Sequence, residues 1–310
     1  MTQVSLAQQV ILITGASTGI GAALARRLAT EFLGIRLVLA ARNKEKLEAV
    51  ATDCRKVGAD VFVVPTDLAQ LEQVKALAKE ALEHFGQVDA LVNNAGYGQM
   101  GPIELIAPED AQRQFAVNFH GPLVLSQALI STMRDRGGGR IINISSLGGR
   151  LAFPAGGMYS ASKFALEALS DVMRMELEAF NIKVSVIEPG PVKTDFFGIS
   201  GDKVDLKVSD SGKELYRAAI KAIKEIEQQT APLAWSSERV AGVIIRALRA
   251  GHPRHRYIAA TGGKTMLFLM TKIMPRRFLD WFWKRFYHID QVEKDWKNRV
   301  RSSDTSQLET

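Results

Sequence analysis

Short apolar runs alternate with longer amphipathic runs through the first two-thirds of the chain. The short runs predict buried parallel strands because they are apolar and β-branched throughout, and the longer runs have helical periodicity. The expected strands are Val10–Thr14, Arg36–Ala41, Val61–Pro65, Ala90–Asn93, Arg140–Ser145 and Lys183–Ile187, and the clearest helices are Ile20–Glu31, Lys44–Val57, Leu71–Phe85 and Tyr159–Phe180. This order predicts right-handed β-α-β units, and so an α/β fold with one doubly wound parallel sheet flanked by helices.

Two regions depart from this alternation. Residues 195–235 are mixed and polar, and we expect a loop and a helix there, over the substrate site. After about residue 251 the composition becomes basic and aromatic. The pattern therefore predicts one α/β domain over residues 1–260, followed by a basic, aromatic and helical C-terminal extension over residues 261–310.

The net charge of +7 is unevenly distributed along the 310 residues. Residues 251–310 contain 12 Lys and Arg against 6 Asp and Glu, so this segment carries +6 of that charge. The remainder of the chain is close to neutral, and its 46% hydrophobic and 24% charged residues are ordinary for a globular protein. A basic character confined to one segment is a weak signal for nucleic acid, and we expect no nucleic-acid partner.

The compartment is predicted from what the sequence lacks. Cys54 is the single cysteine, so no intramolecular disulfide can form, as is usual in a reducing compartment. The first residues contain neither a basic leader nor a long apolar run, and the run Met266–Met270 is far shorter than the roughly 20 residues of a spanning helix. We expect a cytoplasmic protein, with peripheral membrane attachment as the alternative.

A glycine-rich loop follows the first predicted strand. Gly15, Gly19 and Gly21 lie in the run TGASTGIG, directly before a predicted helix. Glycines let the backbone approach a pyrophosphate, and the helix N-terminus adds free N–H groups and the positive end of its dipole. A glycine-rich turn without a ligand is the alternative. The position at the first strand-to-helix turn of an α/β pattern favours dinucleotide binding.

The end of the second strand indicates which dinucleotide binds. An acidic residue at this point would accept hydrogen bonds from the ribose hydroxyls of NAD, but the sequence has Arg42 instead. A guanidinium suits a 2′-phosphate, so NADP(H) is favoured and NAD(H) is the alternative. Arg42 could equally be an ordinary solvated arginine.

A tyrosine and a lysine four residues apart suggest proton chemistry. Tyr159 and Lys163 share one face of a predicted helix, and an ammonium beside a phenol lowers its pKa from about 10. Such a pair can be a surface contact. Here Ser146 follows the fifth strand and Asn118 lies within an apolar helical face, so several polar groups converge on one edge of the sheet. This convergence predicts a general acid/base site.

These motifs together resemble the short-chain dehydrogenase/reductase family over residues 9 to about 260. The matching features are the glycine loop at 14–21, Asp67-Leu68, NNAG at 93–96, Asn118, the set Ser146, Tyr159 and Lys163, and PGPVKT at 189–194. The resemblance implies a Rossmann fold and a dinucleotide-binding and catalytic domain over residues 1–260. It also implies an enzyme that acts on CH–OH groups with NAD(P), such as a carbonyl reductase or an alcohol dehydrogenase.

The resemblance implies a role for each residue. Tyr159 would exchange the proton with the substrate oxygen, Ser146 would hydrogen-bond that oxygen, Lys163 would bind the ribose and lower the pKa of Tyr159, and Asn118 would position a relay water. Together with Arg42, the residues expected at the cofactor are Gly15, Ser17, Thr18, Gly19, Ile20, Gly21, Asp67, Leu68, Asn94, Ala95, Gly96, Tyr159, Lys163, Pro189, Gly190, Val192 and Thr194. No metal site is expected.

The segment between Ser146 and Tyr159 is apolar. Leu147, Leu151, Phe153 and Met158 suggest a pocket for a hydrophobic ketone, aldehyde or alcohol. Residues 159–197 resemble most closely the family's branch of hydroxysteroid and retinol dehydrogenases, which does not identify the substrate.

The C-terminal extension allows three interpretations. Residues 276–290, RRFLDWFWKRFYHID, place several aromatic side chains on a helical stripe after Pro275. This helix could pack on the protein's own core or a partner subunit, form a lid over the pocket, or lie on a membrane with its basic residues near anionic lipid. A membrane contact would involve residues 264–290.

Three functions therefore compete. The first is an NADP(H)-dependent oxidoreductase for a hydrophobic carbonyl/alcohol pair, with Tyr159 as general acid/base. The second is a non-catalytic dinucleotide-binding sensor or scaffold, against which the intact set of Ser146, Tyr159, Lys163 and Asn118 argues. The third is a membrane-recruited relative acting on a lipid-like substrate. The family resemblance also implies a homodimer or homotetramer formed through the helices that carry Asn118 and Tyr159.

Overall fold

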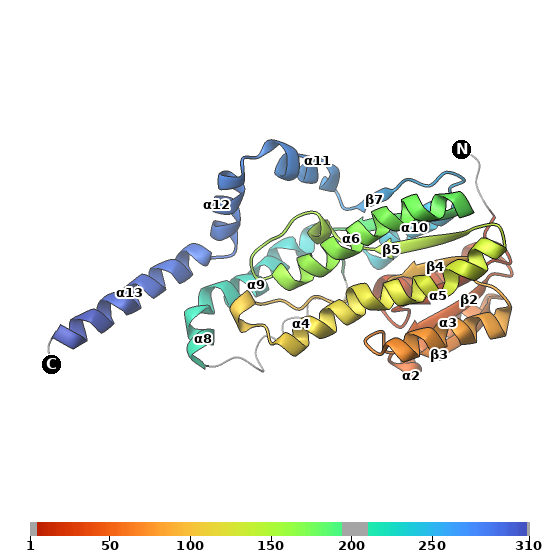
Figure 1. Cartoon of the computed structure of the whole chain (residues 1–310), viewed down its shortest axis with the longest axis horizontal. Coiled ribbons are helices and arrows are strands. Elements are labelled where there is room, and N and C mark those ends of the chain that lie inside the picture. The colour runs from red at the N-terminus through yellow and green to blue at the C-terminus, as the bar shows by residue number, and fades with distance from the viewer. Residues whose placement is uncertain (1–4, 194–209, 309–310) are drawn as a thin grey trace.

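Seven parallel strands form one sheet in the computed structural model, which describes residues 5–193 and 210–308 (Figure 1). The strands are β1 (Val10–Thr14), β2 (Arg36–Ala41), β3 (Asp60–Pro65), β4 (Ala90–Asn93), β5 (Gly139–Ile144), β6 (Ile182–Pro189) and β7 (Arg256–Ala259). Their order is β3-β2-β1-β4-β5-β6-β7, so the direction of winding reverses between β1 and β4. The doubly wound fold is therefore confirmed, and this reversal is where such folds bind ligands.

Helices cover both faces of the sheet. On one face, α1 (Gly19–Glu31), α2 (Lys44–Lys56) and α10 (Ser237–Arg249) contribute to one buried apolar cluster. On the other face, α3 (Leu71–Phe85), α5 (Gly121–Asp135) and α6 (Gly157–Leu177) contribute to a second cluster. The central strands face both clusters, which explains why they are apolar at most positions.

The remaining elements lie mostly at the end of the sheet where the strands finish. Before α6 in the chain are η1 (Ile103–Leu105), α4 (Pro108–Phe115), the π-helical turn η2 (Ala116–His120) and η3 (Leu147–Gly149). After α6 are η4 (Glu178–Phe180), α8 (Asp210–Leu215), α9 (Arg217–Thr230) and η5 (Ala231–Leu233). The predicted substrate region, 195–235, is described from residue 210 onwards, where it is largely helical.

The C-terminal extension is helical. It comprises α11 (Gly263–Phe268), the π-helical turn η6 (Leu269–Ile273), α12 (Arg276–Phe286) and α13 (Ile289–Leu308). Figure 1 shows α11 and α12 outside the sheet layers and α13 extending away from them. Within residues 5–193 and 210–308, no helix has the length and apolar character needed to cross a bilayer.

Candidate active site

The predicted site residues meet at the carboxyl ends of the strands. The glycine loop follows β1, Asp67 follows β3, the segment 94–96 follows β4, Ser146 follows β5 and the segment 190–193 follows β6. Carboxyl ends of parallel strands open on the same edge of the sheet, so residues far apart in sequence become neighbours. Thr194, which was predicted to contact the cofactor, lies outside the described residues.

The glycine loop has no room for side chains. Gly15 has a φ of +65°, and a Cβ there would lie 2.8 Å from the Cα of Ala95. The Asn94 amide nitrogen donates hydrogen bonds to the carbonyl oxygens of Thr14 at 2.9 Å and Gly15 at 3.2 Å. Asn94, at the end of β4, therefore holds the glycine loop in place. This structural role accompanies the cofactor contact that was predicted for Asn94.

The start of α1 is open to an anion. Thr18 precedes the helix in an extended conformation, and its side chain makes no capping hydrogen bond. The first N–H groups of α1 therefore have no side-chain acceptor at this cap, while Ser17 is half-buried and Thr18 is exposed beside them. Free N–H groups and the positive dipole end suit a pyrophosphate. The residues present fit a dinucleotide.

Basic side chains gather on the side of this loop where β2 and β3 end. Arg42 is exposed directly after β2, as its predicted role requires. Asp67 receives a hydrogen bond from the Ala69 N–H at 3.0 Å and pairs with Arg113 at 2.9 Å. Burial raises the pKa of Asp67, but the Ala69 hydrogen bond and Arg113 outweigh it and hold the pKa below its usual range. The sequence did not predict a role for Arg113 at this site, because Arg113 belongs to no recognisable local motif.

Three predicted cofactor residues also pack in the core. Leu68 is buried in the cluster beneath α3 and α5, so only its backbone is available to a ligand. Ile20 is partly buried against the cluster beneath α1. Ala95 likewise packs against the core, and its N–H donates to the Thr14 hydroxyl at 3.0 Å.

Asn118 lies in a π-helical turn, between α4 and α5. Pro122, four residues later, has no N–H to donate to the Asn118 carbonyl, so the regular α-helical hydrogen bond cannot form there. The Gly121 N–H instead bonds the Ala116 carbonyl, five residues back. Such single π-turns often occur at functional sites, and this one places the fully buried Asn118 side chain toward the strand ends.

The Asn118 amide is fixed by three hydrogen bonds. Its nitrogen donates to the Tyr97 carbonyl at 2.9 Å and to the Ser162 hydroxyl at 3.0 Å, and its oxygen accepts from the Tyr97 N–H at 3.2 Å. Ser162 in turn donates to the Tyr159 carbonyl at 2.8 Å. The amide therefore ties the loop after β4 to the helix that carries Tyr159. Neither Tyr97 nor Ser162 was identified from the sequence.

Tyr159 is buried next to Ser146. A hydrogen bond joins the two side-chain hydroxyls, and Ser146 also accepts one from the Gly148 N–H at 3.0 Å. Burial raises the pKa of Tyr159 to about 12, and the Ser146 hydroxyl lowers it only in part. The lowered pKa expected from Lys163 is thus not found in this structure, because the loss of solvation dominates. At neutral pH the side chain is a protonated phenol.

Lys163 is buried one helical turn beyond Tyr159. Its ammonium donates a hydrogen bond to the Ile144 carbonyl at 2.7 Å and lies 6.0 Å from the centre of the Tyr159 ring. A Cβ on Gly96 would lie 3.2 Å from both the Lys163 nitrogen and the Asn118 amide oxygen, so Gly96 allows these groups to approach the same space. Burial lowers the pKa of Lys163 to about 8, although Glu167 raises it.

A partly buried ionic network links this helix to the neighbouring strands. Arg256, on β7, contacts Glu167 at 2.9 Å and Asp171 at 2.6 Å on α6, and Glu188 at 3.4 Å on β6. Arg150, just after the Ser146 turn, pairs with Glu188 at 3.1 Å. The network connects the catalytic helix to two strands and to the loop of Ser146. No sequence motif predicted this network, because its members are spread over more than 100 residues.

The segment after β6 is held by Trp235. The backbone N–H of Trp235 donates to the Pro191 carbonyl at 2.9 Å, and the backbone N–H of Lys193 donates to the Trp235 carbonyl at 2.9 Å. Val192, between them, packs against the core. The Gly190 N–H bonds the Ala259 carbonyl at 3.2 Å, next to Pro189 at the end of β6. This segment is thus a fixed edge of the site.

Apolar side chains enclose Tyr159. Met100 and Tyr159 form a small buried cluster, against which Phe153, Ile220 and Ile223 pack. The last two belong to α9, so part of residues 195–235 covers this apolar cluster. Tyr216, at the start of this cover, donates a hydrogen bond to Glu104 at 2.8 Å and so joins it to η1.

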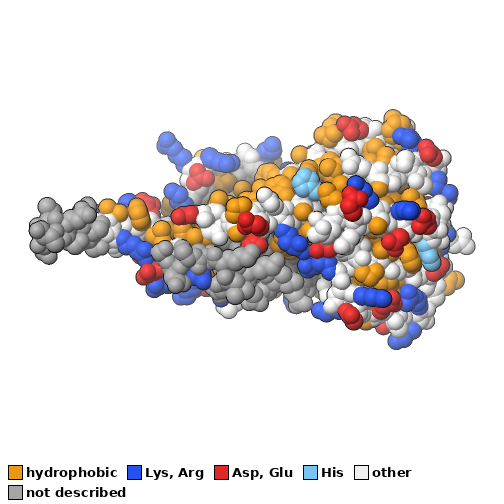
Figure 2. Space-filling view, turned by 60° about the horizontal axis from the view of Figure 1, so that its bottom comes forward, with side chains coloured by type: hydrophobic (Ala, Val, Ile, Leu, Met, Phe, Trp, Pro, Cys, Tyr) orange, Lys and Arg blue, Asp and Glu red, His pale blue; other side chains and the backbone are white. Residues whose placement is uncertain are grey.

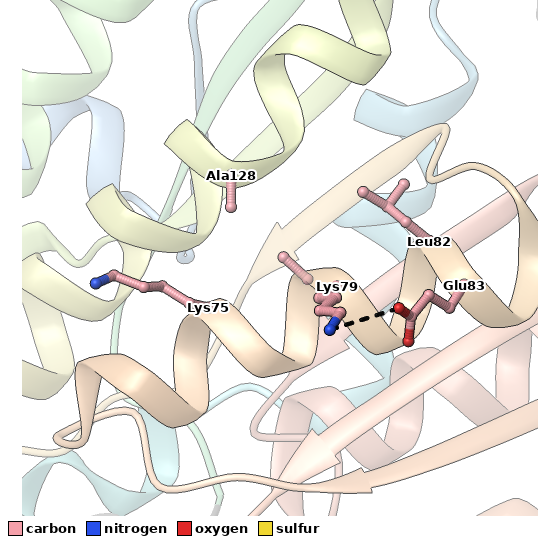
Figure 3. A pocket seen from close by; sticks show the side chains of 6 residues that line it. Lys75, Lys79, Leu82, Glu83 and Ala128 are labelled. Carbon is pink, nitrogen blue, oxygen red and sulfur yellow. Dashed lines mark ion pairs between the residues drawn. The ribbon is translucent and has the colours of Figure 1, made fainter.

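A surface hollow elsewhere lacks such chemistry. Figure 3 shows it between α3 and α5, where its lining residues are Lys75, Ala78, Lys79, Leu82, Glu83 and Ala128. Its Lys79 and Glu83 pair with each other at 3.7 Å across one helical turn. The hollow lies on the outside of the helix layer, and none of the predicted site residues lines it.

The chain is similar in sequence to known dehydrogenases. The sequence pattern of the family described as short chain dehydrogenase matches residues 9–205, more than half of the chain. A relative from Anopheles gambiae, named "Dehydrogenase/reductase SDR family protein 7-like", is 40% identical over 192 residues, 60% of this chain and 60% of the relative. The matched segment thus spans less than two thirds of that relative.

Solved structures share the fold over most of the chain. A metagenomic short-chain oxidoreductase in complex with NADP has a TM-score of 0.66 and 30% identity, covering 83% of this chain and 98% of that one. A short chain dehydrogenase/reductase from Burkholderia phymatum in complex with NAD has a TM-score of 0.76 and 27% identity, covering 87% and 95%. Fold, motifs and sequence agree: the chain belongs to the short chain dehydrogenase family.

Proposed function

We propose that the protein is an NADP(H)-dependent oxidoreductase that interconverts a carbonyl and an alcohol on a hydrophobic substrate. The observation that carries the proposal is the Tyr159 hydroxyl, which is hydrogen-bonded to Ser146 and enclosed by apolar side chains. Lys163 and Asn118 lie beside it, and the anion-binding start of α1 belongs to the same edge of the sheet.

Proton transfer is assigned to Tyr159. The Tyr159 phenol, with a pKa of about 12, is protonated at neutral pH, so it carries the proton that a carbonyl oxygen would receive during reduction. Ser146, which is hydrogen-bonded to Tyr159, would hydrogen-bond the same carbonyl oxygen and orient it. We therefore favour reduction of the carbonyl as the direction in which this arrangement works most directly.

The bound nicotinamide would supply or accept the hydride. Lys163 would hold the ribose hydroxyls with its ammonium. Asn118 would anchor the far end of a proton relay, because its amide is fixed and its carbonyl lacks the usual helical partner at Pro122. Gly15 and Gly21 leave the backbone accessible to the pyrophosphate.

The preference for NADP(H) over NAD(H) rests on charge. Arg42 is exposed at the end of β2, where the 2′-phosphate of NADP would lie, and Arg113 is held close by on Asp67. One solved neighbour is a complex with NADP and another with NAD, so relatives of this fold use either dinucleotide.

The hydrophobic substrate is inferred from the enclosure. The apolar side chains Met100, Phe153, Ile220 and Ile223 pack together with Tyr159. A ketone or aldehyde with an apolar body would bury that body here and leave its oxygen to Tyr159 and Ser146.

The expected homo-oligomer has a suitable surface on α6. Its outward face is an apolar stripe of Ala161, Phe164, Ala168, Val172 and Met175, all exposed in the single chain. Exposed apolar stripes of this kind favour a partner, and α6 also carries Tyr159. We infer that two copies pack through α6, so that assembly stiffens the catalytic helix.

The deciding experiment is the Tyr159→Phe variant in an NADPH oxidation assay against apolar ketones and aldehydes. The substitution removes one oxygen at a buried position, so the fold and the binding of NADPH should persist while turnover falls by at least about 100-fold. Tyr257→Phe, at a tyrosine on β7, is the matched control and should keep turnover. Equal turnover in Tyr159→Phe and the unaltered protein would refute the assignment.

A further inference from the structure

The helix α12 has two different faces. Leu279 is buried with Leu151 near the Ser146 turn, and Phe282 and Trp283 pack against the same cluster. The Phe153 ring lies 6.1 Å from the ring of Trp283. This inner face is part of the protein's own core, and it approaches the apolar side chains that enclose Tyr159.

The outer face of α12 is aromatic and basic. Phe278 is 48% exposed and Trp281 is 60% exposed, and their rings contact each other at 5.5 Å rather than the core. Arg277 and Lys284 are exposed at flanking positions of the helix. The helix thus buries one apolar face and leaves a second aromatic face in solvent.

The segment before α12 continues this character. Met266, Phe268, Leu269 and Ile273 are exposed, so residues 264–285 provide six of the seventeen exposed large hydrophobic side chains in the described parts of the chain. The same segment contains six Lys and Arg and a single acidic residue, Asp280. Figure 2 shows basic side chains gathered with hydrophobic ones about the projecting C-terminal helices. We call the exposed side chains of residues 264–285 the outer surface.

We propose that the outer surface binds the headgroup region of an anionic lipid bilayer. Aromatic side chains are favoured at this depth of a membrane, and an interfacial helix inserts its apolar face while Lys and Arg contact anionic headgroups. The excess of positive charge complements such lipids. A protein partner would have to match both the exposed rings and this charge, whereas an anionic bilayer offers both chemistries over a wide area.

Membrane binding would also deliver substrate, a step that rests on the proposed function. The inner face of α12 contacts Phe153, which packs against Tyr159. We therefore infer that membrane binding would hold α12, and with it the apolar side chains around Tyr159, close to a lipophilic carbonyl compound dissolved in the bilayer.

The binding experiment is co-sedimentation of the full chain with two kinds of vesicle. One contains phosphatidylcholine alone, and the other also contains about 30% phosphatidylserine as the anionic lipid. We expect partitioning to be at least about tenfold stronger with the anionic vesicles at low salt, and weaker as salt screens the charges. The double variant Phe278→Ser/Trp281→Ser should lose most of this binding. Its matched control is Leu33→Ser/Leu233→Ser, at two exposed leucines outside the outer surface.

The charge contribution is tested separately. Arg277→Gln/Lys284→Gln should reduce binding to anionic vesicles severalfold, whereas Lys75→Gln/Lys79→Gln on α3 should not. Vesicles should also shift the tryptophan emission of the unaltered protein to shorter wavelength, and Trp281→Phe should remove most of that shift. Circular dichroism verifies that each variant is folded.

Two results would overturn the proposal. One is equal sedimentation of the unaltered chain and Phe278→Ser/Trp281→Ser with anionic vesicles. The other is no vesicle binding together with a self-association that this double variant abolishes, which would identify the outer surface as an interface between copies.

Activity separates the binding step from the catalytic assignment. A water-soluble ketone should be reduced equally by both proteins, while a lipophilic ketone in vesicles should be reduced more slowly by the variant.

Discussion

At the scale of single residues, the site is governed by desolvation. Tyr159 and Lys163 are both buried, and burial moves their pKa values in opposite directions because it disfavours a phenolate and an ammonium alike. The phenol therefore stays protonated at neutral pH, whereas the Lys163 ammonium is close to losing its proton in the physiological range.

This contrast predicts how cofactor binding depends on pH. The pKa of Lys163 is lowered to about 8, so its ammonium is present below that pH and is lost as the pH rises through it. The affinity for NADPH, measured by fluorescence titration between pH 7 and 9.5, should fall above about pH 8. Lys163→Met should bind weakly at every pH in this range. A pH-independent affinity in the unaltered protein would contradict the assigned role.

Arg42 provides a second prediction at this scale. Removing one hydrogen bond to a charged group costs about 1.5–3 kcal/mol, equivalent to roughly 10- to 100-fold in an equilibrium constant. Arg42→Ala should therefore raise KM for NADPH by about that factor and leave KM for NADH nearly unchanged. Lys75→Ala, which removes a charge on α3, controls for the net charge. An equal effect on both cofactors would exclude recognition of the 2′-phosphate.

At the scale of elements, buried polar groups fix how helices and strands meet. Asn93 donates to Asn143 at 2.8 Å, and Asn143 donates to Ser170 at 2.8 Å, which links β4, β5 and α6 inside the core. The Arg256 network does the same for α6, β6 and β7. Both sets keep the Tyr159 helix in register with the strand end that carries Ser146.

Breaking the Arg256 network should be costly. Arg256→Leu would leave Glu188, which is fully buried, and Glu167 without their shared cation, and losses of about 3–5 kcal/mol are typical for such changes. The free energy of unfolding in urea measures this loss. Arg217→Leu removes the exposed pair with Glu214 and should cost under about 1 kcal/mol.

The same variant should respond to acid in a defined direction. Burial and the nearby Glu167 raise the pKa of Glu188. A carboxyl group with a raised pKa in the folded state contributes stability at low pH, and this contribution is lost as the pH rises through the folded value. The difference in Tm between Arg256→Leu and the unaltered protein should thus be smaller at pH 5 than at pH 8. A constant difference would mean that Glu188 stays ionised throughout.

At the scale of the whole molecule, the described parts of the chain include two exposed apolar surfaces. One is the α6 stripe containing Phe164, Val172 and Met175, and the other is the outer surface of residues 264–285. They lie on different elements, so a self-associated enzyme could still present α12 to a bilayer.

Self-association through α6 is directly testable. Phe164→Glu/Met175→Glu would place charges within the stripe, and sedimentation velocity should then report monomers in place of dimers or tetramers. Leu33→Glu, at another exposed apolar residue, should leave the assembly unchanged. An unaltered protein that is already monomeric at micromolar concentration would disprove the α6 interface.

Much of the architecture follows from local sequence. Five of the strand predictions agree with the structure to within about one residue at each end, and β6 extends two residues beyond its predicted end. The agreement follows because buried parallel strands appear in the sequence as short, mainly apolar runs. The strand β7 was missed, since only Tyr257, Ile258 and Ala259 continue its pattern, and pairing with β6 is what makes it a strand. The motifs also led to the strand ends where the site lies.

What the sequence alone determined is therefore the fold class, the family and the convergence of Ser146, Tyr159, Lys163 and Asn118 on one edge of the sheet, because strand order and local motifs encode them. Tertiary structure decided the rest. It set the raised pKa of Tyr159, the pairing of Arg113 with Asp67, the ionic network around Arg256 and the division of α12 into a core face and an exposed face. Burial and charge pairing depend on residues distant in sequence, so they exist only once the chain has packed.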